Sequence, residues 1–264
     1  MYDLPSEDPE EFGLPDEFHG SQPDLLKKTC LSPHYSQEDY FIASDLNLYY
    51  DSEHPLWYKR PDWFLVLGAK RSQTQQQLRL SYVIWDEQVS PFLVVELASP
   101  GTENEDLGRT ERKDDNRPTK WEVYETILQI PYYVIYDRYK NLFCGFVLRS
   151  GKYEALVLEE GRLWLEDLGL GLGLWQGRYE GVEGLWLRFY DATGEWIPTP
   201  DEQAEQERQE KEREQKRATL AEADRDRERQ QKEQTQAALE QEQQKNQQLR
   251  DRLLQLGVDP DSLP

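Results

Sequence analysis

The segment from Asp201 to Leu256 constrains the fold most, because it contains no Gly and no Pro in 56 consecutive residues. Glu, Gln, Arg and Lys dominate it; they are strong helix formers, and opposite charges recur three and four positions apart. The segment therefore predicts one continuous helix of roughly 80 Å at about 1.5 Å per residue. We expect this helix to begin after Pro198–Pro200 and to end at Gly257, since glycine commonly terminates helices.

Most of this helix is polar on all sides, but a short apolar seam is present near its end. The seam occupies two heptad positions, one with Leu239, Asn246 and Leu253 and the other with Glu242, Leu249 and Leu256. Dimeric coiled coils often carry one Asn at such a position. The pattern leaves two alternatives open, a solvated single helix and a homodimer through this helix.

The first two hundred residues have the composition of a packed domain. The whole chain is 37% hydrophobic and 12% aromatic, and its formal net charge is −21. From Asp201 onward there are 17 acids against 12 bases, which leaves a net charge of −16 on the first two hundred residues. Such an acidic body repels phosphate backbones, so nucleic-acid binding here requires a local cationic surface or bound metal ions.

Apolar and β-branched runs between residues 40 and 199 predict an α+β fold, a mixed sheet flanked by helices. The expected strands are Pro61–Leu67, Leu80–Trp85, Pro91–Ser99 and Tyr132–Tyr136, with hairpins of Leu142–Leu148 with Tyr153–Leu158 and of Gly184–Tyr190 with Glu195–Ile197. A helix is expected over Pro118–Leu128. The Gly-rich run near Leu170 lacks a Lys-Ser/Thr ending, and we interpret its glycines as turn or strand residues.

The remaining segments complete the expected organisation. Residues 1–39 are interpreted as an acidic, Pro-rich and irregular arm, residues 40–199 as the folded domain, residues 200–257 as the long helix, and residues 258–264 as a tail. Cys30 and Cys144 form no metal-ligand or redox spacing, and no apolar run reaches membrane-spanning length. We therefore expect a cytoplasmic protein without a membrane partner. The three histidines, His19, His34 and His54, offer no triad or zinc spacing and are interpreted as surface or packing residues.

Glu96 is an acid inside an otherwise apolar strand. Side chains alternate across a strand, so Phe92, Val94, Glu96 and Ala98 are expected to share one face. Burial of an unpaired carboxylate costs several kcal/mol. A cation partner, a strand end open to water, or a metal ion would compensate.

Asp62 follows Pro61 at the start of another apolar strand, where an Asp is commonly a turn residue. Neighbouring strands lie about 4.8 Å apart, so Asp62 and Glu96 can reach one metal ion if their strands are adjacent. Carboxylate oxygens suit Mg²⁺, which also accepts phosphate oxygens. Lys120, at the start of the following helix, could bring an amine to the same edge of the sheet, although a lysine there is usually only solvated.

These residues occur in an order that resembles the Uma-two family of restriction-endonuclease-like proteins, abundant in cyanobacteria, within the PD-(D/E)xK nuclease superfamily. The segments that carry the resemblance are Pro61-Asp62, Val94 to Thr102, Asp106 to Gly108, Lys120 to Tyr124 and Ile130 to Asp137. They fall within roughly residues 40–160.

The resemblance implies a restriction-endonuclease-like core, with Asp62 and Glu96 as ligands of Mg²⁺ or Mn²⁺ and DNA as substrate. The superfamily's usual lysine lies two residues after the Glu, where this chain has Ala98, and the resemblance implies that Lys120 takes its place. Lys113 is a competing candidate, because the segment before Lys120 is longer than the family pattern. Asp106 is expected either to help hold the metal or to cap a helix.

The resemblance leaves two classes of function open. One is a metal-dependent endonuclease that hydrolyses phosphodiester bonds, with Asp62, Glu96 and Lys120 as its catalytic residues. The other is a catalytically silent scaffold or binding protein that keeps the nuclease fold and engages partners through its C-terminal helix. The acidic body favours the scaffold, whereas the retained Asp62, Glu96 and Lys120 favour the enzyme.

Overall fold

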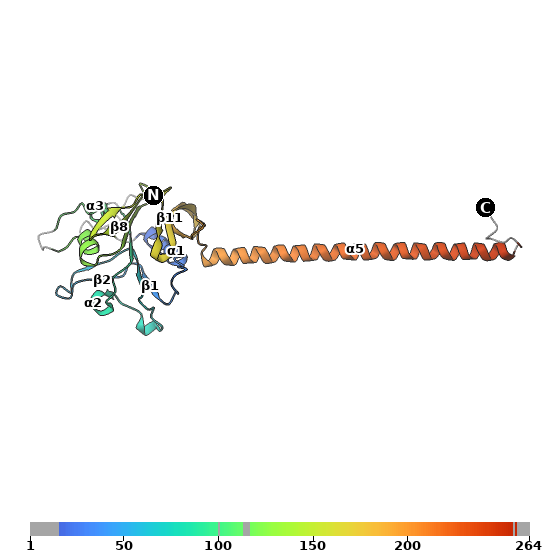
Figure 1. Ribbon diagram of the computed structural model, residues 1–264, viewed down its shortest axis with the longest axis horizontal. Helices are drawn as coiled ribbons and strands as arrows, with labels where there is room; N and C mark the ends of the chain where they lie inside the picture. The colour runs from blue at the N-terminus through green and yellow to red at the C-terminus, as the bar shows by residue number, and fades with distance from the viewer. Residues whose placement is uncertain (1–15, 100, 113–116, 256, 258–264) are drawn as a thin grey trace. The chain divides into compact units, whose positions relative to one another are not determined.

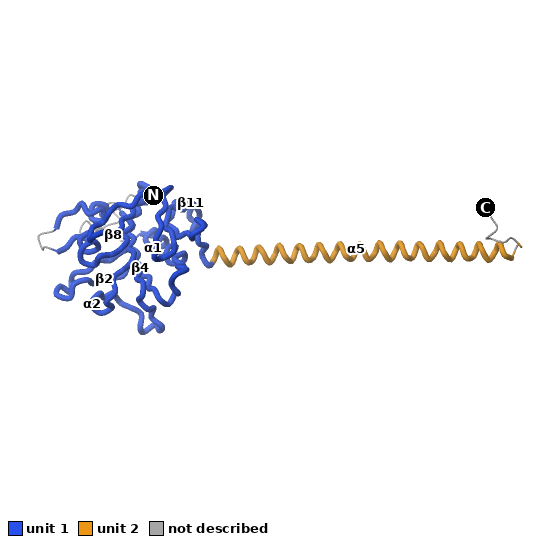
Figure 2. Tube along the Cα trace, in the orientation of Figure 1, with its two compact units in different colours: residues 1–200 blue, residues 201–264 orange. Residues whose placement is uncertain are grey.

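The computed structural model describes residues 16–99, 101–112, 117–255 and 257. The chain divides into two compact units, residues 1–200 and 201–264 (Figure 2). Lys113 lies outside the described residues, so its place as the alternative lysine stays a sequence-based hypothesis.

A six-stranded mixed sheet forms the centre of the first unit (Figure 1). Its strand order is β1 (Tyr40–Ala43), β4 (Trp63–Leu67), β6 (Leu93–Leu97), β7 (Tyr132–Asp137), β8 (Leu142–Arg149) and β9 (Lys152–Ala155). Strands β6 and β7 are parallel, and the other neighbours are antiparallel. The predicted α+β fold with a mixed sheet is confirmed, and so is the predicted hairpin of β8 and β9.

Both faces of the sheet are covered by apolar side chains, as the apolar strand sequences require. Trp63, Leu65 and Val95 belong to one buried cluster, and Phe64 and Val94 belong to the other. Val94 and Ala98 share the second cluster, as alternation predicts for the face of Glu96. Phe92 precedes β6 and packs in the first cluster, so its predicted place on the face of Glu96 is wrong.

Two three-stranded sheets complete the unit. The first has the order β10 (Arg162–Leu165), β11 (Leu170–Tyr179) and β12 (Val182–Tyr190), and the second has β3 (Tyr58–Lys59), β2 (Leu48–Tyr49) and β5 (Tyr82–Val83). The Gly-rich run lies in β11, which confirms its interpretation as strand, and a Cβ at Gly171 would lie 1.9 Å from Cζ of Tyr190. Strand β12 pairs along its whole length with β11. The predicted hairpin of Gly184–Tyr190 with Glu195–Ile197 is limited to a single bridge between Tyr190 and Trp196.

Helix α1 (Glu17–Thr29) was not predicted, and the expectation of an irregular segment is wrong for these residues. The side chains of Asp16 and His19 form a capping box at its start, and its residues Leu25 and Leu26 are fully buried. The helix packs against β12. Pro23 lies inside the helix and polar residues dominate it, so the apolar pattern of a helix is weak there.

The other short helices lie between the strands. They are α2 (Ile84–Glu87), α3 (Glu103–Asp106), α4 (Lys120–Glu122), the π-helix η2 (Val123–Ile127) and the 3₁₀ turns η1 (Gln75–Gln77) and η3 (Glu166–Leu168). The predicted helix over Pro118–Leu128 is confirmed as α4 and η2 together. The predicted strand Leu80–Trp85 is wrong after Val83, because the chain turns into α2 at Ile84.

The second unit is helix α5 (Pro200–Gln255), which confirms the predicted long helix. Nearly all of its side chains are exposed. Gly257 follows it with φ of 78°, a backbone conformation that suits glycine after a helix. Within the described residues we find no helix with the length and apolar character needed to cross a membrane.

Candidate active site

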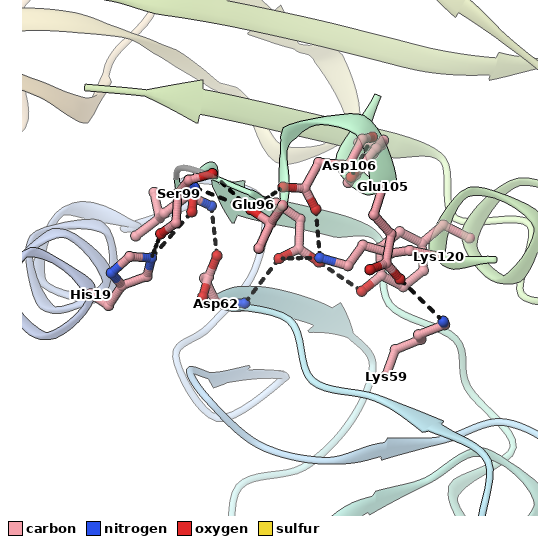
Figure 3. Close-up of polar contacts among 12 residues, drawn as sticks. His19, Lys59, Asp62, Glu96, Ser99, Glu105, Asp106 and Lys120 are labelled. Atoms are coloured by element: carbon pink, nitrogen blue, oxygen red, sulfur yellow. Dashed lines mark hydrogen bonds and ion pairs between the residues drawn. The ribbon is translucent and has the colours of Figure 1, made fainter. Parts of the chain in front are cut away.

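Asp62, which directly precedes β4, lies opposite Glu96 on the antiparallel strand β6. Trp63 pairs with Val95, and one step further along this register Asp62 faces Glu96. The N–H of Leu97 donates to Oδ2 of Asp62 at 2.6 Å, and the N–H of Asp62 donates to Oε2 of Glu96 at 3.5 Å (Figure 3). The structure thus brings the two predicted acids together on one face at one end of the sheet.

The Glu96 carboxylate is buried, with 2% of the residue exposed. The hydroxyl of Tyr124, from η2, donates to Oε1 of Glu96 at 2.8 Å. Nζ of Lys120 lies 3.4 Å from Oε2 of the same carboxylate. The sequence left a cation partner, an open strand end or a metal ion to compensate the buried acid. Of the first two, the structure shows the cation partner, Lys120, and it adds the hydroxyl of Tyr124 as a hydrogen-bond donor.

Lys120 joins Glu96 to Asp106. Its Nζ lies 2.5 Å from Oδ1 of Asp106, while the hydroxyl of Thr102 donates to Oδ2 of Asp106 at 3.1 Å. Thr119 forms a capping box with Glu122 at the start of α4, which fixes the helix turn that carries Lys120. Asp106 is the last residue of α3 and not its N-cap. Its side chain therefore pairs with Lys120 and does not cap the start of this helix.

The pKa values of this cluster reflect burial and mutual charge. Burial raises the pKa of Glu96 well above its usual range, although Lys120 lowers it. Burial also raises the pKa of Asp62, against the lowering effects of the Leu97 N–H and the charges of His19 and Lys120. Burial alone would lower the pKa of Lys120, but the charges of Glu96 and Asp106 outweigh it and raise that pKa, so the lysine stays an ammonium.

The donor chemistry of the cluster fits a divalent cation. The Lys120 ammonium pairs with the carboxyl groups of Glu96 and Asp106, and Asp62 adjoins Glu96, so full ionisation of the three acids leaves an excess of two negative charges over this one lysine. Among the described residues, no group of three or more His, Cys, Asp and Glu side chains is arranged to hold a metal ion. Two carboxylates are nevertheless enough for Mg²⁺, which keeps several waters and takes further ligands from a phosphate.

His19 is a member of this site that the sequence analysis missed. Its Nδ1 lies 2.8 Å from Oδ1 of Asp16, and its Nε2 lies 3.1 Å from the carbonyl oxygen of Leu97 and 3.4 Å from Oγ of Ser99 (Figure 3). The imidazole therefore contacts the residue that follows Glu96. The available sequence signal was the capping pattern Asp16-x-x-His19, which predicts a helix start but says nothing about a strand 78 positions away.

The other histidines and the cysteines lie elsewhere. Nδ1 of His34 lies 3.0 Å from the carbonyl oxygen of Asp167, and the ring of His54 stacks on Trp57 at 3.9 Å. Cys30 is buried and Cys144 is half-buried, and both thiols are free. Packing or surface roles thus suit His34 and His54, whereas His19 departs from that interpretation.

A mixed sheet with two opposed acids at its end, and a lysine from the next helix between them and a third acid, places the first unit in the restriction-endonuclease-like class. The sequence matches the model of the Uma2 family, described as "Putative restriction endonuclease", over residues 2–179. This match spans more than half of the chain, so the chain belongs to the Uma2 family. The family resemblance seen in residues 40–160 is confirmed and extends to the front of the chain.

One solved structure similar to this chain is that of "a putative nuclease belonging to DUF820" from Anabaena variabilis ATCC 29413. The two chains are 11% identical, and the match covers 59% of this chain and 76% of the other with a TM-score of 0.39. The sequence matches no curated protein.

Proposed function

We propose that this protein is a metal-dependent endonuclease that hydrolyses phosphodiester bonds in DNA with Mg²⁺ or Mn²⁺. One observation carries the proposal: Asp62 and Glu96 face each other at the end of two adjacent strands, with Lys120 against Glu96. Two carboxylates at one point of a sheet suit a metal ion that assists phosphodiester hydrolysis, and an amine beside them can orient water or stabilise negative charge. Membership of the Uma2 family supports the same activity.

Each residue of the cluster has a distinct role in this proposal. Asp62 and Glu96 would hold the metal ion, which lowers the pKa of water and neutralises charge on the phosphate when it is bound. Lys120 stays protonated between Glu96 and Asp106, so it is suited to orient the attacking water or to stabilise negative charge, and not to accept a proton. Tyr124 fixes the orientation of the Glu96 carboxylate through its hydroxyl.

Incubation of the purified protein with plasmid DNA and Mn²⁺ tests the proposal. Cleavage is expected for the wild-type protein and is expected to be lost in Asp62→Asn and Glu96→Gln. Glu125→Gln is a matched control, because Glu125 is also a buried, ion-paired acid but pairs with Lys152 outside the site. Cleavage that survives both substitutions at Asp62 and Glu96 would disprove this site.

A catalytically silent scaffold is the second candidate function. The net charge of −16 on the first two hundred residues opposes DNA binding at long range, and α5 offers an exposed surface for partners. Titration calorimetry with Mg²⁺ or Mn²⁺ separates the two functions. Binding that is lost in Glu96→Gln supports the enzyme, and the absence of binding by the wild-type protein supports the scaffold.

A homodimer through the end of α5 is a further part of the proposal. Leu239 and Leu249 belong to the apolar seam and are 49% and 61% exposed in the single chain. Exposed leucines at heptad spacing, with Asn246 among them, are typical of a helix that pairs with a second copy of itself.

A further inference from the structure

A cavity of about 240 Å³ lies beside the acid cluster. Its walls come from four places in the sequence, namely Lys59, Glu105 and the segments Thr110–Arg112 and Arg117–Thr119. Thr119 directly precedes Lys120, and Glu105 directly precedes Asp106, so the cavity adjoins the site on its lysine side. Figure 3 shows Lys59 and Glu105 next to Lys120.

Cations gather around this cavity although the unit as a whole is acidic. Lys59, Arg112 and Arg117 line it, against the two acids Glu105 and Glu111. Arg112 also pairs with Glu122, with Nε 2.9 Å from its Oε2. The wall thus carries three cations against two acids, and an acidic protein needs such local cations to approach a phosphate backbone.

Lys59 is the most constrained of these cations. Its side chain is only 11% exposed, and its Nζ lies 3.6 Å from Oε1 of Glu105, which is a loose ion pair. Burial lowers the pKa of Lys59, and the positive charges of Lys120 and Arg117 lower it further, whereas Glu105 raises it. Lys59 thus carries a mostly buried ammonium with only a loose ion pair, and an anion in the cavity would favour its charged form.

We propose that this cavity binds a phosphate group of the substrate strand adjacent to the phosphodiester that is cleaved. The inference rests on the proposed nuclease function, and it adds on which side of the acid cluster the DNA strand would lie. Arginine and lysine together suit phosphate oxygens, because the guanidinium gives paired hydrogen bonds and the ammonium a compact charge. Glu105 and Thr119 line the cavity and directly precede Asp106 and Lys120, which places this phosphate next to the acid cluster.

Fluorescence anisotropy with a short labelled DNA duplex tests the inference, in the Glu96→Gln background so that the probe stays intact. Lys59→Gln and Arg117→Gln are each expected to weaken binding about fivefold. Each is also expected to reduce the slope of log affinity against log salt by about one, since one phosphate contact is lost. Glu105→Gln removes a competing acid and is expected to strengthen binding, which a folding defect would not do.

Arg149→Gln is the matched control, because Arg149 is an exposed arginine on β8 that pairs with Glu154 away from the cavity. It is expected to leave both affinity and salt slope unchanged. Normal affinity and slope in folded Lys59→Gln and Arg117→Gln, or no duplex binding by the parent protein, would overturn the inference. If the wild-type protein cleaves DNA and the Lys59 and Arg117 variants bind the duplex normally, this inference alone is overturned. If the two variants bind more weakly but the wild-type protein cleaves no DNA, only the nuclease proposal is overturned.

Discussion

The carboxylate of Asp62 accepts a hydrogen bond from the residue after Glu96, while the N–H of Asp62 points back at Oε2 of Glu96. The two acids are therefore held together by the backbones of β4 and β6 and not by flexible side chains alone. Residues directly opposite on antiparallel strands have Cβ atoms about 4.5–5.5 Å apart. This arrangement holds the buried carboxyl group of Glu96 and the half-buried one of Asp62 together, and it has measurable consequences.

Glu96→Gln is expected to stabilise the metal-free protein, because folding raises the pKa of Glu96 and so disfavours its charged form at neutral pH. A gain of about 1 kcal/mol would raise Tm by about 2–4 °C in a chain of this size. Thermal unfolding in EDTA measures this change. Addition of Mg²⁺ or Mn²⁺ is expected to raise the Tm of the wild-type protein and to leave that of Glu96→Gln unchanged. Equal metal-dependent shifts in the two proteins would contradict a shared ion at this site.

Lys120→Met is expected to have the opposite effect on stability. The substitution leaves the buried carboxylates of Glu96 and Asp106 without their cation. Removal of one partner of a buried ion pair costs about 3–5 kcal/mol. Urea unfolding in EDTA measures the loss, and Mg²⁺ is expected to restore part of it. Lys120→Arg keeps the charge and serves as the control, and an unchanged unfolding midpoint in Lys120→Met would contradict the geometry described here.

The strands of the central sheet could be predicted from local patterns, whereas the meeting of Asp62 with Glu96 was predicted on the condition that their strands are adjacent and was implied by the family resemblance. Apolar runs define the strands, alternation defines which face Glu96 occupies, and an acid at the start of a neighbouring strand is then within reach. Phe92 shows the limit of this reasoning, because it lies just before β6 and packs in the first cluster, against the alternation that Val94 and Ala98 follow.

The contacts of His19 and Lys59 could not be predicted in the same way. Helix α1 contains Gly20 and Pro23 and carries mostly polar residues, so its sequence lacks a helical apolar pattern although Leu25 and Leu26 are buried. The approach of His19 to Leu97, and of Lys59 to the segment before Lys120, depends on tertiary packing between distant segments. No periodicity within either segment encodes such a contact.

Glu125 offers a pH-dependent test outside the site. Burial raises its pKa, but the Lys152 ammonium and the N–H of Tyr153 outweigh burial and lower it. A lowered pKa means that this acid stabilises the fold above its unfolded pKa of about 4.3, and that the contribution is lost as pH falls through the folded pKa. Glu125→Gln is therefore expected to lose roughly 1–2 kcal/mol at neutral pH. Urea unfolding across pH is expected to show the difference from wild type shrinking in acid, and a difference independent of pH would contradict this assignment.

The seam of α5 gives a prediction about oligomeric state. Leu249→Lys is expected to convert a weak dimer into a monomer, because it places a charge at a heptad position that otherwise pairs leucines. Sedimentation equilibrium over a range of protein concentrations measures the mass. Leu220→Lys is the matched control, since Leu220 is 66% exposed on the same helix but lies outside the seam. A monomeric wild-type protein at every concentration would support the alternative of a solvated single helix.

His19 is expected to act as a positioning residue for the acid pair. Its Nε2 lies against the carbonyl of Leu97, whose N–H holds the Asp62 carboxylate, so His19 supports the backbone that orients Asp62. Loss of such a supporting contact commonly costs about 10–100-fold in metal affinity. His19→Ala is therefore expected to weaken Mn²⁺ binding in titration calorimetry by about tenfold. His19→Gln, which keeps a side-chain N–H for Leu97, is expected to recover most of that affinity, while His34→Ala, a histidine away from the site, is expected to change nothing. If His19→Ala binds Mn²⁺ as tightly as the wild-type protein, the imidazole only caps α1, and the backbone of β6 holds Asp62 without its help.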